Sequence, residues 1–164
     1  MLVTVEGEER TARLWSLPDM QARGKVGDHT GIVRHVEFSP DGKHVLTASD
    51  DHSARIYRLN GDLTAKIQTG ARVKHATFSD DGLLVLTCKE SKSGAAQLWR
   101  VSDGIEVVHF DGHRDSLVWG TFNGATTWAA TAARDGTTCI WPTDPVAVAE
   151  RLPSHKASTT TLPK

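Results

Sequence analysis

The sequence predicts an all-β fold built from repeated sheets of short antiparallel strands. Aromatic residues recur at a constant interval of 42 residues, at Trp15, Tyr57, Trp99 and Trp141. Between them, short runs of alternating apolar and polar residues are separated by tight-turn signals. No segment carries an apolar stripe with helical spacing. Together these observations indicate a chain of repeated β-units.

One complete repeat runs from Ile32 to Thr69. Residues 32–38 alternate between apolar and polar, as expected for a half-buried strand. Ser39–Gly42 then predicts a tight turn, because Pro presets φ and Gly tolerates positive φ. Further turn signals at 50–53 and 60–62 separate three more strands. Each repeat is therefore expected to hold four antiparallel strands.

A repeat of about 40–45 residues with four strands is typical of β-propeller blades. We expect a partial blade over residues 1–28 and further blades at about 29–70, 71–112 and 113–151. The polar tail, 152–164, falls where another blade would begin. It lacks an apolar anchor, so we expect a degenerate or unstructured strand there.

From Leu2 to about Arg151 the chain resembles the WD40 repeat family. Residues 27–59 are similar to nearly one full family unit, and residues 111–141 resemble it again with the Gly-His pair intact. The resemblance implies an all-β fold of WD40-type β-propeller blades, as a partial or small propeller. It also implies a buried hydrogen-bonded tetrad of His, Ser or Thr, Asp and Trp within a blade.

The resemblance places two such tetrads in this chain. The last complete repeat would supply His113, Thr131, Asp135 and Trp141. The first complete repeat would supply His29, Thr47, Asp51 and Tyr57, with Tyr in place of Trp. The carboxylate is expected to orient the imidazole, the imidazole to meet the hydroxyl, and the hydroxyl to meet the aromatic donor, because buried polar groups need partners.

The middle repeat departs from this pattern. Ala71 stands at the histidine position, and the turn Glu90–Gly94 is longer and has no Asp. Only Thr87 and Trp99 remain of the tetrad. We expect this blade to be held more by apolar packing and to be the least well specified.

Three architectures fit the chain length. The chain is a fragment of a larger propeller, half of a propeller completed by a second copy, or a four-bladed ring in which residues 157–162 pair beside residues 2–6. We favour the fragment, because Met1 falls directly before a second strand of a blade.

Composition narrows the function classes. Nineteen Lys and Arg residues against 20 Asp and Glu give a net charge of −1, which argues against nucleic-acid binding. There is no apolar stretch long enough for a transmembrane helix and no signal-peptide pattern. Cys88 and Cys139 are expected to be packed thiols in a reducing, cytoplasmic compartment.

No motif predicts catalysis, a metal site or a cofactor. His109 and His113 have the spacing of a helical metal pair, but they fall on a strand and a loop. The prediction is therefore a non-catalytic protein-protein interaction scaffold. The alternative is a regulatory or targeting module of a larger enzyme, of kinase or nucleotide-binding type, whose catalytic domain lies outside this chain.

Blade loops on a rigid scaffold are the expected recognition surface. The resemblance points to the loops before the first strand and before the Trp strand, which carry Asp50, Arg72, Lys89, Arg114 and Arg134. Arg is favoured at interface hot spots. The expected partners are other proteins or peptides, together with self-association that completes the propeller.

Overall fold

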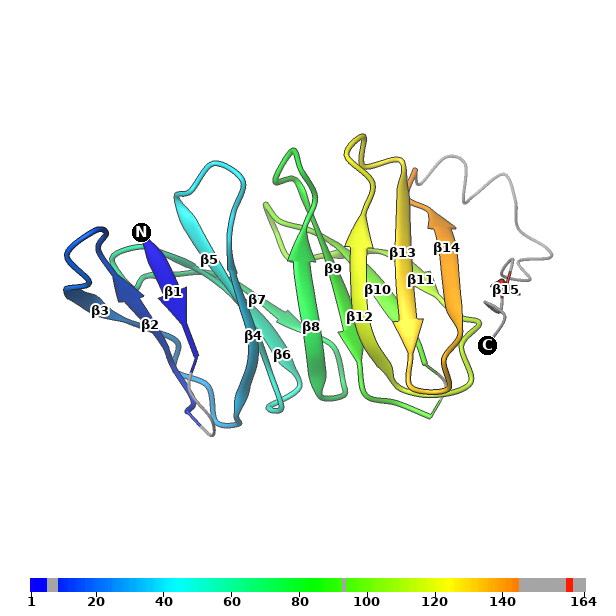
Figure 1. Cartoon of the computed structure of the whole chain (residues 1–164). Coiled ribbons are helices and arrows are strands. Elements are labelled where there is room, and N and C mark those ends of the chain that lie inside the picture. Colours follow the sequence, from blue (N-terminus) through cyan, green and yellow to red (C-terminus); the bar gives the residue numbers. More distant parts are fainter. Residues whose placement is uncertain (6–8, 93, 145–158, 161–164) are drawn as a thin grey trace.

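The protein consists of four antiparallel sheets packed side by side (Figure 1). The structure is a computed structural model and describes residues 1–5, 9–92, 94–144 and 159–160. Within these ranges every regular element is a strand, and no helix is long and apolar enough to cross a membrane. The predicted all-β fold of blade-like sheets is confirmed.

Strand bounds follow the predicted repeats closely. The first sheet contains β1 (Leu2–Thr4), β2 (Ala12–Trp15) and β3 (Ala22–Val26). The second contains β4 (Val33–Phe38), β5 (His44–Ser49), β6 (Ser53–Arg58) and β7 (Leu63–Gln68). The third contains β8 (Val73–Phe78), β9 (Leu84–Lys89), β10 (Ala96–Arg100) and β11 (Glu106–Phe110). The fourth contains β12 (Leu117–Phe122), β13 (Trp128–Ala133), β14 (Thr138–Pro142) and β15 (Thr159–Thr160).

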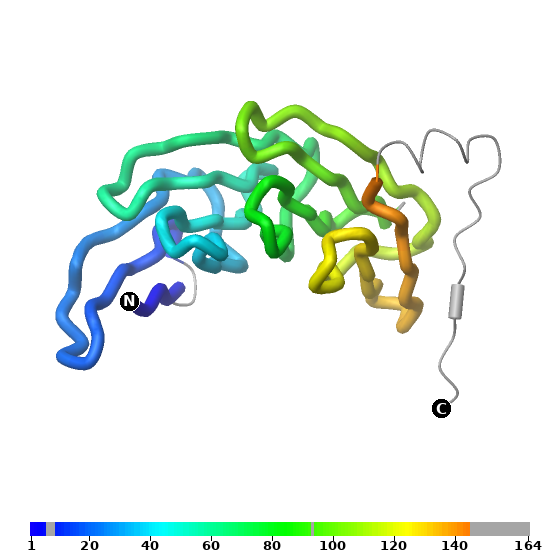
Figure 2. The backbone as a smooth tube through the Cα atoms, turned by 90° about the horizontal axis from the view of Figure 1, so that it is seen from above, coloured from blue at the N-terminus to red at the C-terminus, as the bar shows by residue number. Residues whose placement is uncertain are grey.

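Each sheet is a meander in which strands pair with their chain neighbours. The predicted Ser39–Gly42 turn joins β4 to β5: Gly42 has φ of 68° and donates from its N–H to the Ser39 carbonyl at 2.8 Å. The inner strand β8 contacts both β4 and β12, and the sheets fan out from these strands as an open arc (Figure 2).

The apolar core lies between the sheets, in three layers. Alternate residues of each strand point to opposite faces, so every interior sheet contributes to two layers. Leu14 of the first sheet packs with Tyr57 of the second, Ile56 of the second with Trp99 of the third, and Leu98 of the third with Trp141 of the fourth. This stacking holds the loops at one edge of all four sheets in a fixed row.

One of the three architectures considered, the four-bladed ring in which the tail pairs beside residues 2–6, is not the one observed. Thr159 and Thr160 pair with Cys139 and Thr138 as the fourth strand of the last sheet, not beside residues 2–6. The sequence placed this outer strand before Arg151, and residues 145–151 lie outside the described residues. A strand edge at β14 offers unpaired backbone groups, which is why a short Thr-rich segment pairs there.

Candidate protein-interaction surface

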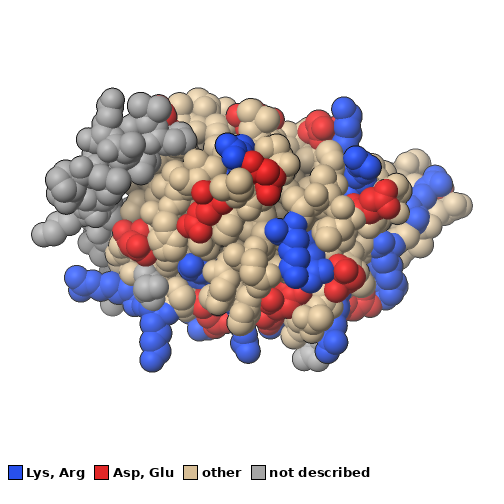
Figure 3. All heavy atoms as spheres, turned by 180° about the vertical axis from the view of Figure 1, so that it is seen from behind, with Lys and Arg blue, Asp and Glu red and all other residues tan. Residues whose placement is uncertain are grey.

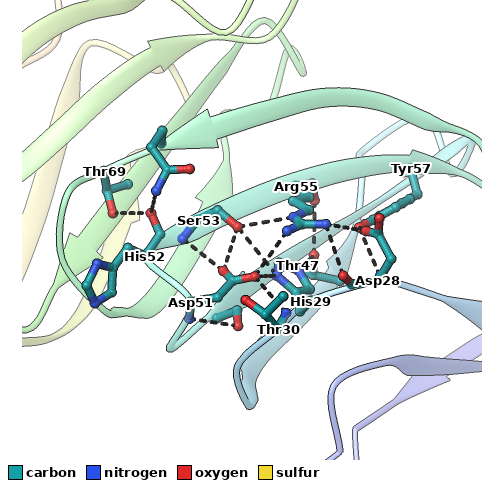
Figure 4. A network of polar contacts seen from close by, with 12 residues as sticks. Asp28, His29, Thr30, Thr47, Asp51, His52, Ser53, Arg55, Tyr57 and Thr69 are labelled. Atoms are coloured by element: carbon teal, nitrogen blue, oxygen red, sulfur yellow. Dashed lines mark hydrogen bonds and ion pairs between the residues drawn. The ribbon is translucent and has the colours of Figure 1, made fainter.

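A buried histidine fixes the loop that leads into the second sheet (Figure 4). The Nδ1 atom of His29 lies 2.8 Å from Asp51 Oδ2, and its Nε2 atom lies 2.7 Å from Thr47 Oγ1. The His29 side chain is fully buried and that of Asp51 nearly so. Asp51 also accepts a hydrogen bond from the Thr30 N–H at 3.1 Å. These contacts join the loop to β5 and to the β5–β6 turn.

Tyr57 does not complete this network in the way predicted. Its hydroxyl donates to Asp28 Oδ1 at 2.7 Å rather than meeting Thr47. The physical reason is geometric: a phenol carries its polar atom at the far end of the ring, whereas indole carries its N–H on the inner ring. Arg55 bridges the two groups, with its guanidinium bonded to Asp28 and, at 3.1 Å, to Asp51.

The charges in this network shift the pKa values of its members. Burial would raise the pKa of Asp51, but hydrogen bonds from Ser53 and His29 lower it to about 2. Burial lowers the pKa of His29 despite the neighbouring Asp51. Burial and the bond to Asp28 raise the pKa of Tyr57 to about 12. The carboxylate is therefore ionised, the phenol neutral, and the Arg55 charge is compensated.

His113 occupies the same place in the fourth sheet, with one change. Its Nε2 lies 2.8 Å from Thr131 Oγ1, and the Trp141 indole N–H donates to the same oxygen at 2.8 Å. Its Nδ1 lies 2.9 Å from Thr137 Oγ1, which in turn bonds Asp135 at 2.7 Å. Asp135 is exposed and reaches the imidazole only through Thr137, so its prediction as a buried, direct partner is wrong.

The third sheet keeps only the hydroxyl–indole pair. The Trp99 N–H donates to Thr87 Oγ1 at 2.9 Å, as Trp15 does to Thr4 in the first sheet. The longer turn after β9 packs closely on the next loop, because a Cβ atom on Gly94 would clash with the Asp115 carbonyl oxygen. Tight packing of this loop on the next one replaces the missing imidazole.

Sequence reasoning missed Asp28, Arg55 and Thr137. Thr137 had a detectable signal, because it stands two residues after Asp135 as Ser53 stands two after Asp51. Ser53 Oγ likewise bonds its Asp, at 2.6 Å. Asp28 and Arg55 are far apart in the chain, so only the loop geometry shows that they meet.

A charged rim runs along the loop edge of the second and third sheets, and we define it by five alternating residues: Arg34, Asp50, Lys74, Glu90 and Arg72. Arg34 Nε donates to Asp50 at 2.9 Å. Lys74 Nζ lies 3.3 Å from Asp50 and 3.0 Å from Glu90, and Arg72 lies 3.8 Å from Glu90. Burial would raise the pKa of Asp50, but Arg34 and Lys74 hold it below its ordinary value.

The rim brings together several of the predicted binding residues. Asp50 is mostly covered and organises the cations around it, whereas Arg72 is exposed. Arg134 lies beside Lys74 and Glu90 in a pocket of about 280 Å³ that Val118 also lines. Arg114 is exposed on the loop before β12. Lys89 is half-buried and is the last residue of β9, so its predicted place on a loop is wrong. Seen from behind, basic and acidic side chains alternate along the lower edge of the molecule (Figure 3).

Three neighbouring rings, tilted to one another, lie across the inner strands next to the rim. The ring centroids of His35 and His75 are 4.1 Å apart, and those of His75 and Trp119 are 4.0 Å apart. Trp119 remains 54% exposed. Burial and the neighbouring His35 lower the pKa of His75 to about 3, and burial also lowers the pKa of His35, so both imidazoles favour the neutral form. These rings recur with the same spacing as Thr47, Thr87 and Thr131, a signal that the sequence contained.

Metal-binding geometry is not found in the parts of the chain that the structure describes: no three His, Cys, Asp or Glu side chains are grouped to hold an ion. Cys88 and Cys139 are both buried and unpaired with each other. Burial raises the pKa of the Cys88 thiol to about 12. The arrangement offers recognition chemistry, through ordered charges and exposed rings on a rigid edge.

The family model described as "WD domain, G-beta repeat" matches residues 21–58 and 104–142. The chain contains WD40 repeats. Each matched WD40 segment spans the outer strand of one sheet and three strands of the next, β3–β6 and β11–β14. The segment between the two matches contains Ala71 in place of histidine, which agrees with its departure from the WD40 pattern.

Several curated proteins are similar to this chain. Pre-mRNA-processing factor 19 homolog 2 of Arabidopsis thaliana is 28% identical over 141 residues, which cover 82% of this chain and 27% of that protein. Protein HIR1 of Kluyveromyces lactis is 27% identical over 165 residues, covering 80% and 19%. The probable cytosolic iron-sulfur protein assembly protein CIAO1 homolog of Caenorhabditis elegans is 34% identical over 99 residues, covering 53% and 29%. The chain thus spans less than a third of each.

Proposed function

We propose that this WD40 chain is a non-catalytic scaffold that binds other proteins or peptides through the charged rim and the adjoining rings of His35, His75 and Trp119. The observation that carries the proposal is the ordering of the rim. Five charges from two sheets are fixed in alternation, and Arg134 lines a pocket together with Lys74 and Glu90. Trp119, which is exposed, packs on His75 of the strand that carries Lys74. Pre-ordered charges lower the entropic cost of binding a polar partner.

Electrostatic complementarity of this kind favours specificity and fast association. The rim offers cations held by carboxylates, and Trp119 offers a large apolar surface next to them. Arg and Trp are the residue types most often found at binding hot spots. A peptide with an acidic residue next to an apolar one matches both features.

The relatives' names support the proposal in general terms only. One similar protein is named a DDB1- and CUL4-associated factor, and another a pre-mRNA-processing factor. Placement in a reducing, cytoplasmic compartment is part of the proposal and is supported by the two free cysteines. The alternative, a regulatory module of a larger enzyme, would use the same surface.

Charge reversal tests the proposal. Proteins from an extract are captured on the immobilised chain and quantified for the wild type and for Arg134→Glu. Arg134 lines the same pocket as Lys74 and Glu90 of the rim, so proteins that bind this surface should be lost on Arg134→Glu. They should be retained on the control Arg23→Glu, a change at an exposed residue of β3. Each captured partner is then purified and titrated against both variants. Equal binding by both variants contradicts the proposed surface.

A further inference from the structure

The fourth sheet has an exposed apolar face. Ile140 is 55% exposed and Trp128 42% exposed on this face, and Ala130 is half-buried between them. Ala130 and Ile140 are direct cross-strand partners. Scattered exposed apolar residues are ordinary, but neighbouring ones on a single sheet face indicate an interaction surface.

The chain itself shows what covers such a face. The cross-strand pairs at the same register are Val3–Leu14, Leu46–Ile56 and Leu86–Leu98. Leu14 is 1% exposed, and Ile56 and Leu98 are 0% exposed, because each packs against the next sheet. The Ala130–Ile140 pair is the fourth member of this series, with a smaller residue on β13, and no sheet among the described residues lies in front of it.

The covering side of each sheet is equally regular. Within the chain, three cross-strand pairs form the face that packs on the preceding sheet: Val45–Tyr57, Val85–Trp99 and Ala129–Trp141. All six residues are at most 5% exposed. The first sheet presents the same kind of pair, Leu2–Trp15, and there Leu2 is 37% exposed.

The face of the first sheet that carries Leu2 and Trp15 has the same side-chain arrangement as the faces that cover a preceding sheet elsewhere in the chain. The Trp15 N–H donates to Thr4 at 2.9 Å, as Trp99 does to Thr87 at 2.9 Å and Trp141 to Thr131 at 2.8 Å. In the last two cases the indole orientation fixed by this bond covers the preceding sheet. The open face at one end of the arc and the free covering side at the other end are therefore complementary halves of one interface.

We propose that the open face of the fourth sheet packs against the first sheet of a second copy of this chain. Such a head-to-tail contact joins unlike surfaces and forms a closed ring when its rotation closes. Two open arcs of four sheets (Figure 2) give eight sheets, within the usual range of about 4–8 blades for a closed propeller. The two contacts then cover both end faces of each chain.

Sedimentation velocity over a wide concentration range tests the proposal with the full chain. The wild type should reversibly form a dimer. Ile140→Glu and Leu2→Glu should each weaken dimer formation more than about tenfold, because each places a charge against an apolar surface. Ile105→Glu is the matched control, since Ile105 is also 55% exposed but lies in the β10–β11 turn. It should leave the dimer unchanged.

Mixing the two variants identifies the occupant. An Ile140→Glu chain keeps a normal first sheet, and a Leu2→Glu chain keeps a normal fourth sheet, so an equal mixture should again form dimers. A dimer abolished by Ile140→Glu, unaffected by Leu2→Glu and not restored by mixing would mean that two fourth sheets meet face to face. That result, a monomer at every concentration, or a ladder of larger assemblies overturns the proposal.

Discussion

The second and third sheets have the same strand order and the same apolar register, but their loops are held by different means. In the second sheet, His29, Asp51 and Arg55 form a buried ionic and hydrogen-bonded network. In the third sheet, Ala71 replaces the histidine, and close packing at Gly94 positions the loop after β9. Because both sheets stack equally well, the apolar register is sufficient for stacking. The polar network serves to fix the loops.

The largest effect is expected from removing the carboxylate at the centre of the second sheet's network. Asp51→Ala should lower the free energy of unfolding by about 3 kcal/mol, because it leaves the buried His29 imidazole without its carboxylate partner and removes one of the two carboxylates that compensate the Arg55 charge. Urea unfolding measures this loss. Asp135→Ala, the exposed counterpart in the fourth sheet, should cause a much smaller loss. Equal losses would show that Asp135 is also a buried, direct partner.

Lowering the pH should destabilise the protein through His75 of β8, the inner strand of the third sheet. The pKa of His75 is lowered to about 3, so the folded state favours the neutral ring. Its contribution to stability is therefore fully present above pH 6.5 and is lost as the pH falls toward 3. Between these values the expected slope is about 1.4 kcal/mol per pH unit. His75→Gln should flatten the pH dependence of the free energy of unfolding, measured by urea unfolding. An NMR titration of His75 with a midpoint near 6.5 would contradict this prediction.

A smaller effect should follow from removing the polar pair that the third sheet retains. Thr87→Val leaves the buried Trp99 N–H without its acceptor and should cost about 1–2 kcal/mol. Thermal or urea unfolding measures it. Thr64→Val, an exposed change on β7, is the control and should be nearly neutral. No loss on Thr87→Val would show that water replaces the hydroxyl.

The smallest effect is local. Backbone amides of the loop at 70–72 should exchange with solvent faster than those of the loop at 28–31, because His29 ties only the latter to the sheet behind it. Native-state hydrogen exchange measures both loops in one sample. Similar protection of the two would mean that backbone contacts alone order these loops, and that the histidine adds little.

Much of the fold could be predicted because its signals are periodic. The constant spacing of Trp15, Tyr57, Trp99 and Trp141, with turn residues between them, specifies the strand count and the sheet faces. The Thr47–His29 and Thr131–His113 contacts could be inferred from a family pattern that repeats in register. The sequence spacing corresponds directly to the structure, because each blade is formed by residues that are close together in the chain.

What only the tertiary structure decided concerns atoms brought together from different loops. Burial, which depends on neighbouring loops, makes Asp51 a direct partner of histidine and leaves Asp135 exposed behind Thr137. The meeting of Asp28 with Arg55, and of Asp50 with Lys74 across two sheets, has no signature in sequence spacing. The sequence by itself determined the repeated sheet and its two apolar faces. The stacking of those sheets determined which polar groups pair and which face remains uncovered, because pairing and exposure depend on what lies opposite.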